Sequence, residues 1–218
     1  MAEHPYDHLD LTRRSRRILK LFILLFMFSI QLTEITMANE KLKNQSETSA
    51  LPNTDLTQSE TAVFGAGCFW GVEEIIRKIP GVIDTTVGYC GGTLADPTYR
   101  DVTTETTGHA EAIEVHYDPK IVSYETLLDY FFRFHDPTTH YRQGNDIGSQ
   151  YRSVIFYQNE AQKTLAETKR QAVDGSGKWE NPVVTEIVSA QPFYPAEDYH
   201  QDYLQKNPGG YSCHYLRD

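Results

Sequence analysis

The chain has 218 residues, a mass of 24.9 kDa and a formal net charge of −10 at pH 7. Its 39% hydrophobic content, with 14 Tyr and 10 Phe, indicates a largely folded protein that is long enough to bury a substantial core. The acidic balance argues against nucleic acid as the main partner, because binding a phosphate backbone relies on clustered Lys and Arg.

Residues 1–38 have the layout of a signal or targeting segment. A basic stretch at 13–20 (RRSRRILK) precedes an apolar run at 21–30 (LFILLFMFSI), which is shorter than the about 20 residues that span a bilayer comfortably. This layout favours an exported protein of the periplasm or cell envelope. An uncleaved amphipathic anchor and a core helix are alternatives. Translation from Met37 would instead leave the protein in the cytoplasm.

Residues 39–60 are rich in Ser, Thr, Asn and Gln and contain almost no large apolar side chains. Such a composition is typical of a polar linker, because it offers too little apolar surface to build a core. We therefore expect one folded domain at residues 61–218.

The folded part predicts alternating strands and helices, from runs of β-branched residues and from apolar residues at helical spacing. In chain order we expect strands and helices at 62–64 (strand), 69–79 (helix), 82–89 (strand), 110–117 (strand), 127–134 (helix), 154–157 (strand), 159–173 (helix) and 183–188 (strand). A Gly/Pro/Thr loop lies between 91 and 109. The order βαββαβ predicts an α+β fold, a ferredoxin-like two-layer sandwich with an extra helix and strand and an irregular C-terminal tail.

Three cysteines, Cys68, Cys90 and Cys213, are too few for a disulfide-stapled scaffold, and no CxxC pair indicates a zinc ribbon. Cys68 lies between a predicted strand and the first turn of a predicted helix, where free backbone N–H groups and the helix dipole favour a thiolate. A buried Cys acting as a small hydrophobic residue is the alternative. The glycines on both sides of the GCFWG segment argue for close backbone approach rather than simple filling.

Glu111 shares strand parity with Ile113, Val115 and Tyr117, so it faces the apolar layer if the strand extends that far. A carboxyl in apolar surroundings has a raised pKa and remains available as a general acid near neutral pH. If the strand starts later, Glu111 is solvated. The polar loop at 144–152 fits ligand binding or a plain turn. Six histidines of the predicted folded part show no HxxxH or HExxH spacing, so no metal or other cofactor is expected; they are His109, His116, His135, His140, His200 and His214.

Nine motifs occur in the folded part in a fixed order. They are GCFWGVEE (67–74), GYCGG (88–92), PTYRDV (97–102), TGHAEA (107–112), VHYDP (115–119), HDPT (135–138), QGNDIGSQYRS (143–153), PFYPAEDYHQDYL (192–204) and KNPGGYSCHY (206–215). Together they resemble the A-type peptide methionine sulfoxide reductases, and the resemblance covers residues 61–216. It implies a thioredoxin-dependent enzyme that reduces methionine S-sulfoxide, free or in proteins, and so repairs oxidised proteins.

The resemblance also implies roles for single residues. Cys68 would attack the sulfoxide sulfur and become a sulfenic acid, while Glu111 would protonate the oxygen. Tyr99 and Tyr151 would hold that oxygen through their hydroxyl groups.

Three further residues would bind the rest of the substrate. Phe69 and Trp70 would enclose the S-methyl group and select the S epimer. Asp146 would meet the backbone N–H of the methionyl residue or help to organise the pocket.

Cys213 would resolve the sulfenic acid to a disulfide, which a thioredoxin-like dithiol would reduce by exchange. The Gly- and Pro-rich tail at 208–212 is expected to be mobile enough to bring Cys213 onto Cys68. Cys90 is expected to be a small, partly buried residue, with a role as an alternative resolving thiol as the weaker hypothesis. The protein is expected to be a monomer.

Two other function classes share parts of this pattern. A thiol peroxidase would use the same nucleophile and resolving thiol, but it has no need for a Phe-Trp pair around a methyl group. An exported redox or metal-binding module would use Cys68 and Cys213 structurally and would consume no sulfoxide.

Overall fold

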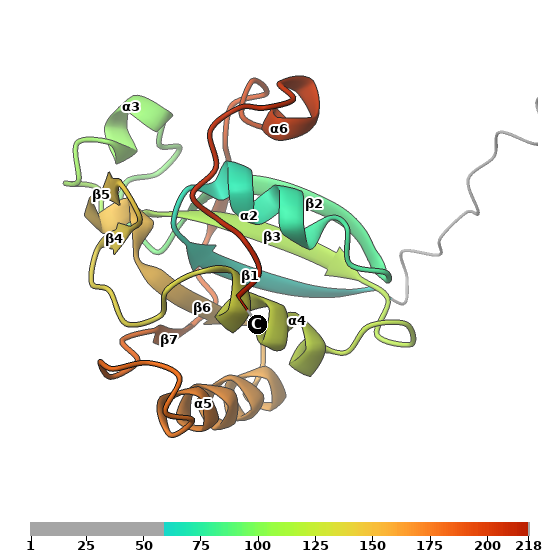
Figure 1. The fold of residues 1–218 in the computed structure, drawn as a ribbon. Helices are drawn as coiled ribbons and strands as arrows, with labels where there is room; N and C mark the ends of the chain where they lie inside the picture. Colours follow the sequence, from blue (N-terminus) through green and yellow to red (C-terminus); the bar gives the residue numbers. More distant parts are fainter. Residues whose placement is uncertain (1–58, 218) are drawn as a thin grey trace, which may run out of the picture. The chain divides into compact units, whose positions relative to one another are not determined.

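A six-stranded sheet forms the centre of the computed structural model, which describes residues 59–217 (Figure 1). The strands are β1 (Glu60–Ala66), β2 (Val82–Cys90), β3 (Ala110–Tyr117), β4 (Arg142–Gln143), β5 (Asp146–Ile147), β6 (Ser153–Tyr157), β7 (Glu186–Ser189) and β8 (Phe193–Pro195). The helices are α2 (Phe69–Ile76), α3 (Tyr99–Val102), α4 (Tyr124–Phe134), the 3-10 helix η2 (Ser149–Tyr151), α5 (Glu160–Asp174) and α6 (Tyr203–Lys206).

The strand order in the sheet is β7-β6-β1-β3-β2-β8, and β4 and β5 form a separate two-stranded hairpin. β3 lies between β1 and β2 and is antiparallel to both, while β6 is antiparallel to β1. The outer strands differ, because β7 is parallel to β6 and β8 is antiparallel to β2. The order βαββαβ of β1, α2, β2, β3, α4 and β6 and the α+β class are as predicted.

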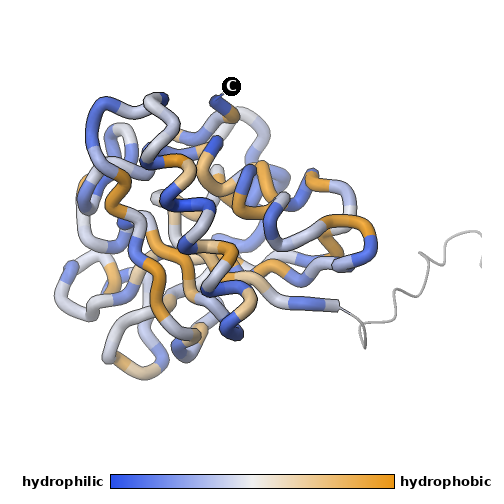
Figure 2. Tube along the Cα trace, turned by 90° about the horizontal axis from the view of Figure 1, so that it is seen from below, coloured by the Kyte–Doolittle hydropathy of each residue, from blue (hydrophilic) through white to orange (hydrophobic). Residues whose placement is uncertain are grey.

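The two faces of the sheet bury separate clusters, as the period-two alternation of a strand requires. The larger cluster includes Phe64, Val87, Ile113, Val115, Ile155 and the apolar faces of α2 and α4. The smaller cluster on the opposite face consists of Val63, Cys90, Ala110, Ala112, Val154 and Phe156. Figure 2 shows the resulting alternation of hydrophobic and hydrophilic segments along the chain.

Helix starts follow local capping chemistry where the sequence supplies it. The side chain of Ser123 accepts from the Thr126 N–H at the start of α4, and Asn159 accepts from the Gln162 N–H at the start of α5. α2 differs, because its N-cap is Cys68, whose side chain makes no capping hydrogen bond. α2 therefore presents a thiol at the position where α4 and α5 have a polar cap.

Residues 200–217, called the C-terminal segment below, contain α6 and then run across α2 towards α4 (Figure 1). Its start is tied to α2 by Glu73, whose carboxylate accepts from the backbone N–H of Asp202 at 2.9 Å. Arg77 lies 2.8 Å from the same carboxylate and also bonds to the side chain of Asp202. The end of the segment is tied to α4, because the N–H of Arg217 donates to the carbonyl of Arg133 at 2.8 Å. The tail is irregular, as predicted, but it is docked at both ends.

Several short elements were not predicted. α3 lies in the expected Gly/Pro/Thr loop and starts at a capping box of Thr98 and Asp101, while β4, β5, β8 and α6 are too short for a periodic pattern. The strand predicted at 183–188 begins instead at Glu186, because the N–H groups of Val183 and Val184 bond outside the sheet.

The predicted targeting segment and almost all of the predicted linker lie outside the described residues. Within residues 59–217, no helix is long and apolar enough to cross a membrane.

Glu73→Ala is expected to lower the free energy of unfolding by about 2 kcal/mol, because it removes one of the carboxylates that pair with the mostly buried Arg77 and leaves the Asp202 N–H without its acceptor. Glu74→Ala, the neighbouring change at a more exposed ion pair, should cost less than about 1 kcal/mol. Urea denaturation of both variants measures the difference. Equal losses would contradict this account of how the C-terminal segment is fixed.

Candidate functional site

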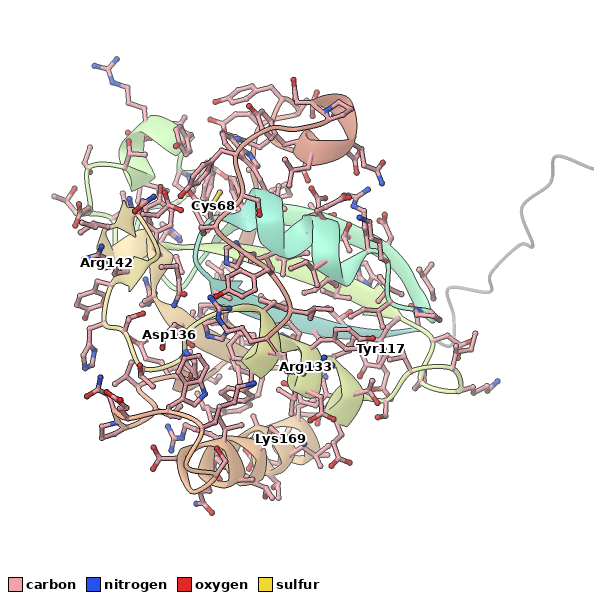
Figure 3. All side chains as sticks on the ribbon, viewed as in Figure 1. Cys68, Tyr117, Arg133, Asp136, Arg142 and Lys169 are labelled. Atoms are coloured by element: carbon pink, nitrogen blue, oxygen red, sulfur yellow. The ribbon has the colours of Figure 1, made fainter. Side chains whose placement is uncertain are left out.

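Cys68 lies between β1 and α2, and Figure 3 labels it at the N-terminal end of that helix. The preceding Gly67 has a φ of +97°, which lets the chain turn sharply from the strand into the helix. The Cys68 side chain is buried. Burial and the neighbouring Glu111 raise the pKa of Cys68 far above its usual range, and the backbone N–H of Trp70 lowers it only in part.

The free N–H groups and the helix terminus, which favour a thiolate at Cys68, are therefore outweighed by burial. Loss of hydration opposes the charged form more strongly than one N–H donor and the helix end favour it. Cys68 is a neutral thiol at rest, and it needs a proton acceptor at the moment of reaction.

Glu111 lies on β3 directly opposite Tyr89 of β2 and points into the larger cluster, as strand parity predicts. Its side chain is only 2% exposed. Burial raises its pKa to about 8, although the N–H of Phe69 donates to Oε2 at 3.1 Å and lowers it. At neutral pH the carboxyl is therefore protonated, and it lies beside the first turn of α2.

Tyr99, from α3, and Tyr151, from η2, bring two phenol groups to the same place. Their hydroxyl groups are hydrogen-bonded to each other. Burial raises the pKa of both, and the charges of Glu111 and Cys68 raise each pKa further. Both phenols are thus neutral hydrogen-bond donors next to the thiol and the carboxyl.

Aromatic rings form one wall of the site. Phe69 is buried, and its ring lies 6.0 Å from that of Tyr89. Trp70 stacks on Tyr203 of α6 at 3.7 Å and donates from Nε1 to Nδ1 of His200 at 3.0 Å. The C-terminal segment thereby fixes the indole.

His200 and Glu197 are site residues to which the sequence analysis assigned no role. The His200 ring lies 5.1 Å from Phe69 and 4.6 Å from Tyr99, so it joins the two sides of the pocket. Glu197 accepts from the backbone N–H of Tyr99 at 2.9 Å. Their only sequence signal was the motif PFYPAEDYHQDYL, because a contact across about 100 residues leaves no local pattern.

His200 has one polar atom left for a ligand. Its Nδ1 accepts from Trp70, so Nε2 carries the hydrogen in the neutral ring. Burial lowers the pKa of His200, which favours that neutral form. Among residues 59–217, the buried Nε2 has no hydrogen-bond partner.

Asp146 and Cys213 complete the site from the other side. Asp146 lies on the β4–β5 hairpin, where it accepts from the hydroxyl of Tyr211 at 3.1 Å and from the thiol of Cys213. A Cβ placed on Gly144 would lie 3.3 Å from the Cβ of Cys213, so the tail packs against the turn of this hairpin. Burial and Asp146 raise the pKa of Cys213 to about 12.

The structure brings together all eight residues that the sequence analysis singled out for the site. They are Cys68, Phe69, Trp70, Tyr99, Glu111, Asp146, Tyr151 and Cys213. Cys90 is not among them, because it lies in the smaller cluster on the opposite face of the sheet. Its Sγ lies 3.8 Å from the carbonyl of Gln191.

The arrangement combines a nucleophilic sulfur, a protonated carboxyl and two phenols with an aromatic wall. It suits a substrate that has an apolar group for the wall and a weakly basic oxygen that must be protonated before it leaves. No group of His, Cys, Asp and Glu among residues 59–217 is arranged to hold a metal ion.

Comparison with known proteins connects this geometry with a family. Residues 60–218 match the sequence model of the family described as peptide methionine sulfoxide reductase. The peptide methionine sulfoxide reductase MsrA 1 of Mesorhizobium japonicum is 53% identical over 161 residues, which cover 74% of this chain and 91% of the relative.

Solved structures show the same mixed α+β fold. The reduced form of Mxr1 from Saccharomyces cerevisiae matches with a TM-score of 0.70 and 40% identity, covering 75% of this chain and 95% of that chain. The structure of Mxr1 in complex with Trx2 matches with a TM-score of 0.51 and 29% identity, covering 78% and 97%.

Glu111→Gln is expected to change how stability depends on pH. A carboxyl whose pKa is raised from 4.5 to about 8 by folding releases its proton on unfolding, so stability is lost as pH rises between these values. The glutamine variant has no such proton to release, so its stability does not fall in this way. The difference in free energy of unfolding, variant minus wild type, should therefore rise by about 1.4 kcal/mol per pH unit between roughly pH 5 and 8.

Urea denaturation across this pH range measures the difference. Glu114→Gln, a matched change at a half-exposed position of the same strand, controls for the substitution. The same pH dependence in both variants would show that Glu111 is not the group responsible.

Proposed function

Because this chain belongs to the A-type peptide methionine sulfoxide reductase family, we propose that the site around Cys68 reduces methionine S-sulfoxide, free or in proteins, to methionine. One observation carries the proposal: the thiol lies beside a buried carboxyl that stays protonated at neutral pH. Sulfoxide oxygen is a poor leaving group until it accepts a proton, and Glu111 supplies that proton. The activity repairs oxidised proteins.

The first step balances without an external acid or base. Glu111 gives its proton to the sulfoxide oxygen, and its carboxylate then takes the proton of the Cys68 thiol. The Cys68 sulfur bonds to the sulfoxide sulfur, the oxygen moves to Cys68 as a hydroxyl, and methionine leaves. Cys68 is oxidised by two electrons to a sulfenic acid, and the sulfoxide is reduced by two. The high pKa of the resting thiol protects it from other oxidants until substrate is bound.

The walls of the pocket account for selectivity. Tyr99 and Tyr151 are neutral donors beside Glu111, so they hold the oxygen in the position where the proton arrives. Phe69 and Trp70 receive the S-methyl group on the opposite side. Exchanging the oxygen and the lone pair at sulfur would point the oxygen away from these donors, and hence only the S epimer reacts.

One further group contacts the methionyl backbone or shapes the pocket. Asp146 accepts from a backbone N–H of the substrate or keeps the hairpin in place through Tyr211.

A thiol peroxidase would have no use for the aromatic wall, and this is why the reductase is preferred.

Cys213 resolves the sulfenic acid, because it is the second thiol on the same side of the sheet and lies near enough to Cys68 to influence the pKa of that thiol. The product is a Cys68–Cys213 disulfide. A thioredoxin-like dithiol reduces it by exchange, in line with the complex of the related Mxr1 with Trx2. Cys90 takes no part, since the sheet separates it from both thiols.

Three wider features complete the proposal: the type of sandwich, the localisation and the oligomeric state. The central strand order β6-β1-β3-β2 with the βαββαβ connection supports a ferredoxin-like sandwich. The basic and apolar stretches at 13–30 support export to the periplasm or envelope, where the substrates would be oxidised methionines of exported proteins. One copy carries the whole set of site residues, which supports a monomer.

The direct test supplies the two separated methionine sulfoxide epimers to the protein with dithiothreitol as the reductant. The S epimer alone should be consumed. Cys68→Ser should abolish turnover, and Glu111→Gln should lower kcat by about 10²–10³-fold, because the acid is lost while the amide keeps its size. Cys90→Ser is the matched thiol control and should leave turnover unchanged. Turnover of neither epimer by folded, reduced protein would refute the proposal.

The rate of methionine release in a single turnover should fall at alkaline pH. The reactive form of Glu111 is the protonated one, and its pKa is about 8, so the rate should drop about tenfold per pH unit above that value. Stopped reactions between pH 6 and 10 check this. A rate that rises through the same range would assign the limiting step to thiol ionisation instead.

A further inference from the structure

His214 follows Cys213 in the chain, and its partly buried ring lies beside α2. Nε2 lies 2.7 Å from the carbonyl oxygen of Ala66. A carbonyl oxygen only accepts, so Nε2 carries the hydrogen and Nδ1 keeps a lone pair. Burial lowers the pKa of His214 to about 4, and at neutral pH the ring is therefore neutral with this tautomer.

The same ring contacts the neighbouring thiol. Nδ1 lies 3.4 Å from Sγ of Cys213, so the sulfur lies between the imidazole and the carboxylate of Asp146. Ala66 is the last residue of β1 and precedes Cys68 by two positions. The hydrogen bond from His214 to Ala66 thus connects the two cysteine-bearing segments next to both sulfurs.

Two glycines leave room for the tail at the start of α2. A Cβ on Gly71 of α2 would lie 2.5 Å from Oγ of Ser212 and 2.7 Å from Nδ1 of His214. A Cβ on Gly67 would lie 3.2 Å from Nε2 of His214. Both glycines of the GCFWG segment therefore permit this docking, in addition to the turn that Gly67 makes.

We propose that His214 is a positioning residue that holds Cys213 in place for the attack on the Cys68 sulfenic acid. The inference rests on the proposed resolving role of Cys213. Tyr211 holds the tail to Asp146 of the β4–β5 hairpin, and the fixed points at Asp202 and Arg217 lie further from Cys213 along the chain. The His214–Ala66 bond is the contact that ties the tail to the end of β1, next to Cys68. Without this bond the thiol is no longer held to that segment, and the chance of finding it at Cys68 falls.

The step that His214 assists is a condensation. The sulfur of Cys213 loses its proton and bonds to the sulfur of Cys68, and the S–O bond breaks. The hydroxide takes a proton from Glu111 and leaves as water, and the proton of Cys213 returns to the carboxylate through solvent or Asp146. No oxidant is needed, because the sulfenic acid already holds the oxidising equivalents.

Three substitutions separate positioning from other effects. In His214→Gln the amide nitrogen reaches about as far as Nε2 and again donates to Ala66. In His214→Asn the amide is too short to reach, although its chemistry is the same. His214→Ala removes the ring altogether. Gly71→Ala places a methyl group against the His214 ring and so disturbs its docking from the side of α2. This variant replaces the His214 variants in the test if they fold poorly.

The readout is single turnover of L-methionine S-sulfoxide without a reductant, stopped with acid and a thiol-blocking reagent. Mass spectrometry follows the Cys68–Cys213 disulfide, and chromatography follows methionine. Methionine release should keep its wild-type rate in all His214 variants. Disulfide formation should slow about tenfold in the Ala and Asn variants, the size expected for one buried hydrogen bond, and stay within about twofold of wild type in the Gln variant.

The outcomes are distinct. Wild-type rates of disulfide formation in His214→Ala, or a Gln variant as slow as the Asn variant, would overturn the positioning role while the proposed function stands. A wild-type protein that releases methionine but forms no Cys68–Cys213 disulfide would refute the resolving role and the His214 proposal with it. A wild-type protein that releases no methionine would refute the proposed function itself.

Discussion

The burial of one carboxyl is the constraint on which the rest of the site depends. Glu111 is placed in the apolar cluster beneath the first turn of α2, where the backbone N–H of Phe69 donates to its carboxyl. This burial costs stability at neutral pH, and it also keeps a proton next to Cys68. The same low-polarity surroundings keep the thiol neutral. Acid and nucleophile are therefore both held in their protonated forms until a substrate oxygen accepts the first proton.

Elements that are distant in the sequence place the thiol next to this buried carboxyl and cover the site. The pairing of β1 with β3 sets Cys68 above Glu111, since α2 starts directly where β1 ends. The C-terminal segment then covers the site, with Tyr203 and His200 against Trp70 and with Cys213 against the β4–β5 hairpin. Docking of this segment on α2 fixes the Trp70 indole in the aromatic wall and supplies the second thiol. This explains why a buried ion pair, Glu73 with Arg77, is retained where the segment begins.

Much of this arrangement was predictable, where a local pattern carries the information. The alternation along 110–117 predicted both the bounds of β3 and the direction of Glu111. The protonation state of Cys68 could not be predicted in the same way. The helix-terminus argument is local, whereas the burial that raises the pKa of this thiol comes from distant chain segments. The same limit applies to Glu197, His200 and His214, whose partners lie about 100 or more residues away. The tail was expected to be mobile from its glycines, but in the structure the His214 side chain bonds to the end of β1 and the Arg217 backbone N–H bonds to α4.

The central claim is that Glu111 remains protonated at neutral pH in the folded protein. Infrared difference spectroscopy of wild type against Glu111→Gln isolates the protonated carboxyl band of this residue, and its loss with rising pH gives the pKa directly. The account predicts a midpoint of about 8. A midpoint near the ordinary carboxyl value of 4.5 would contradict it, because no acid would then be present for the sulfoxide oxygen.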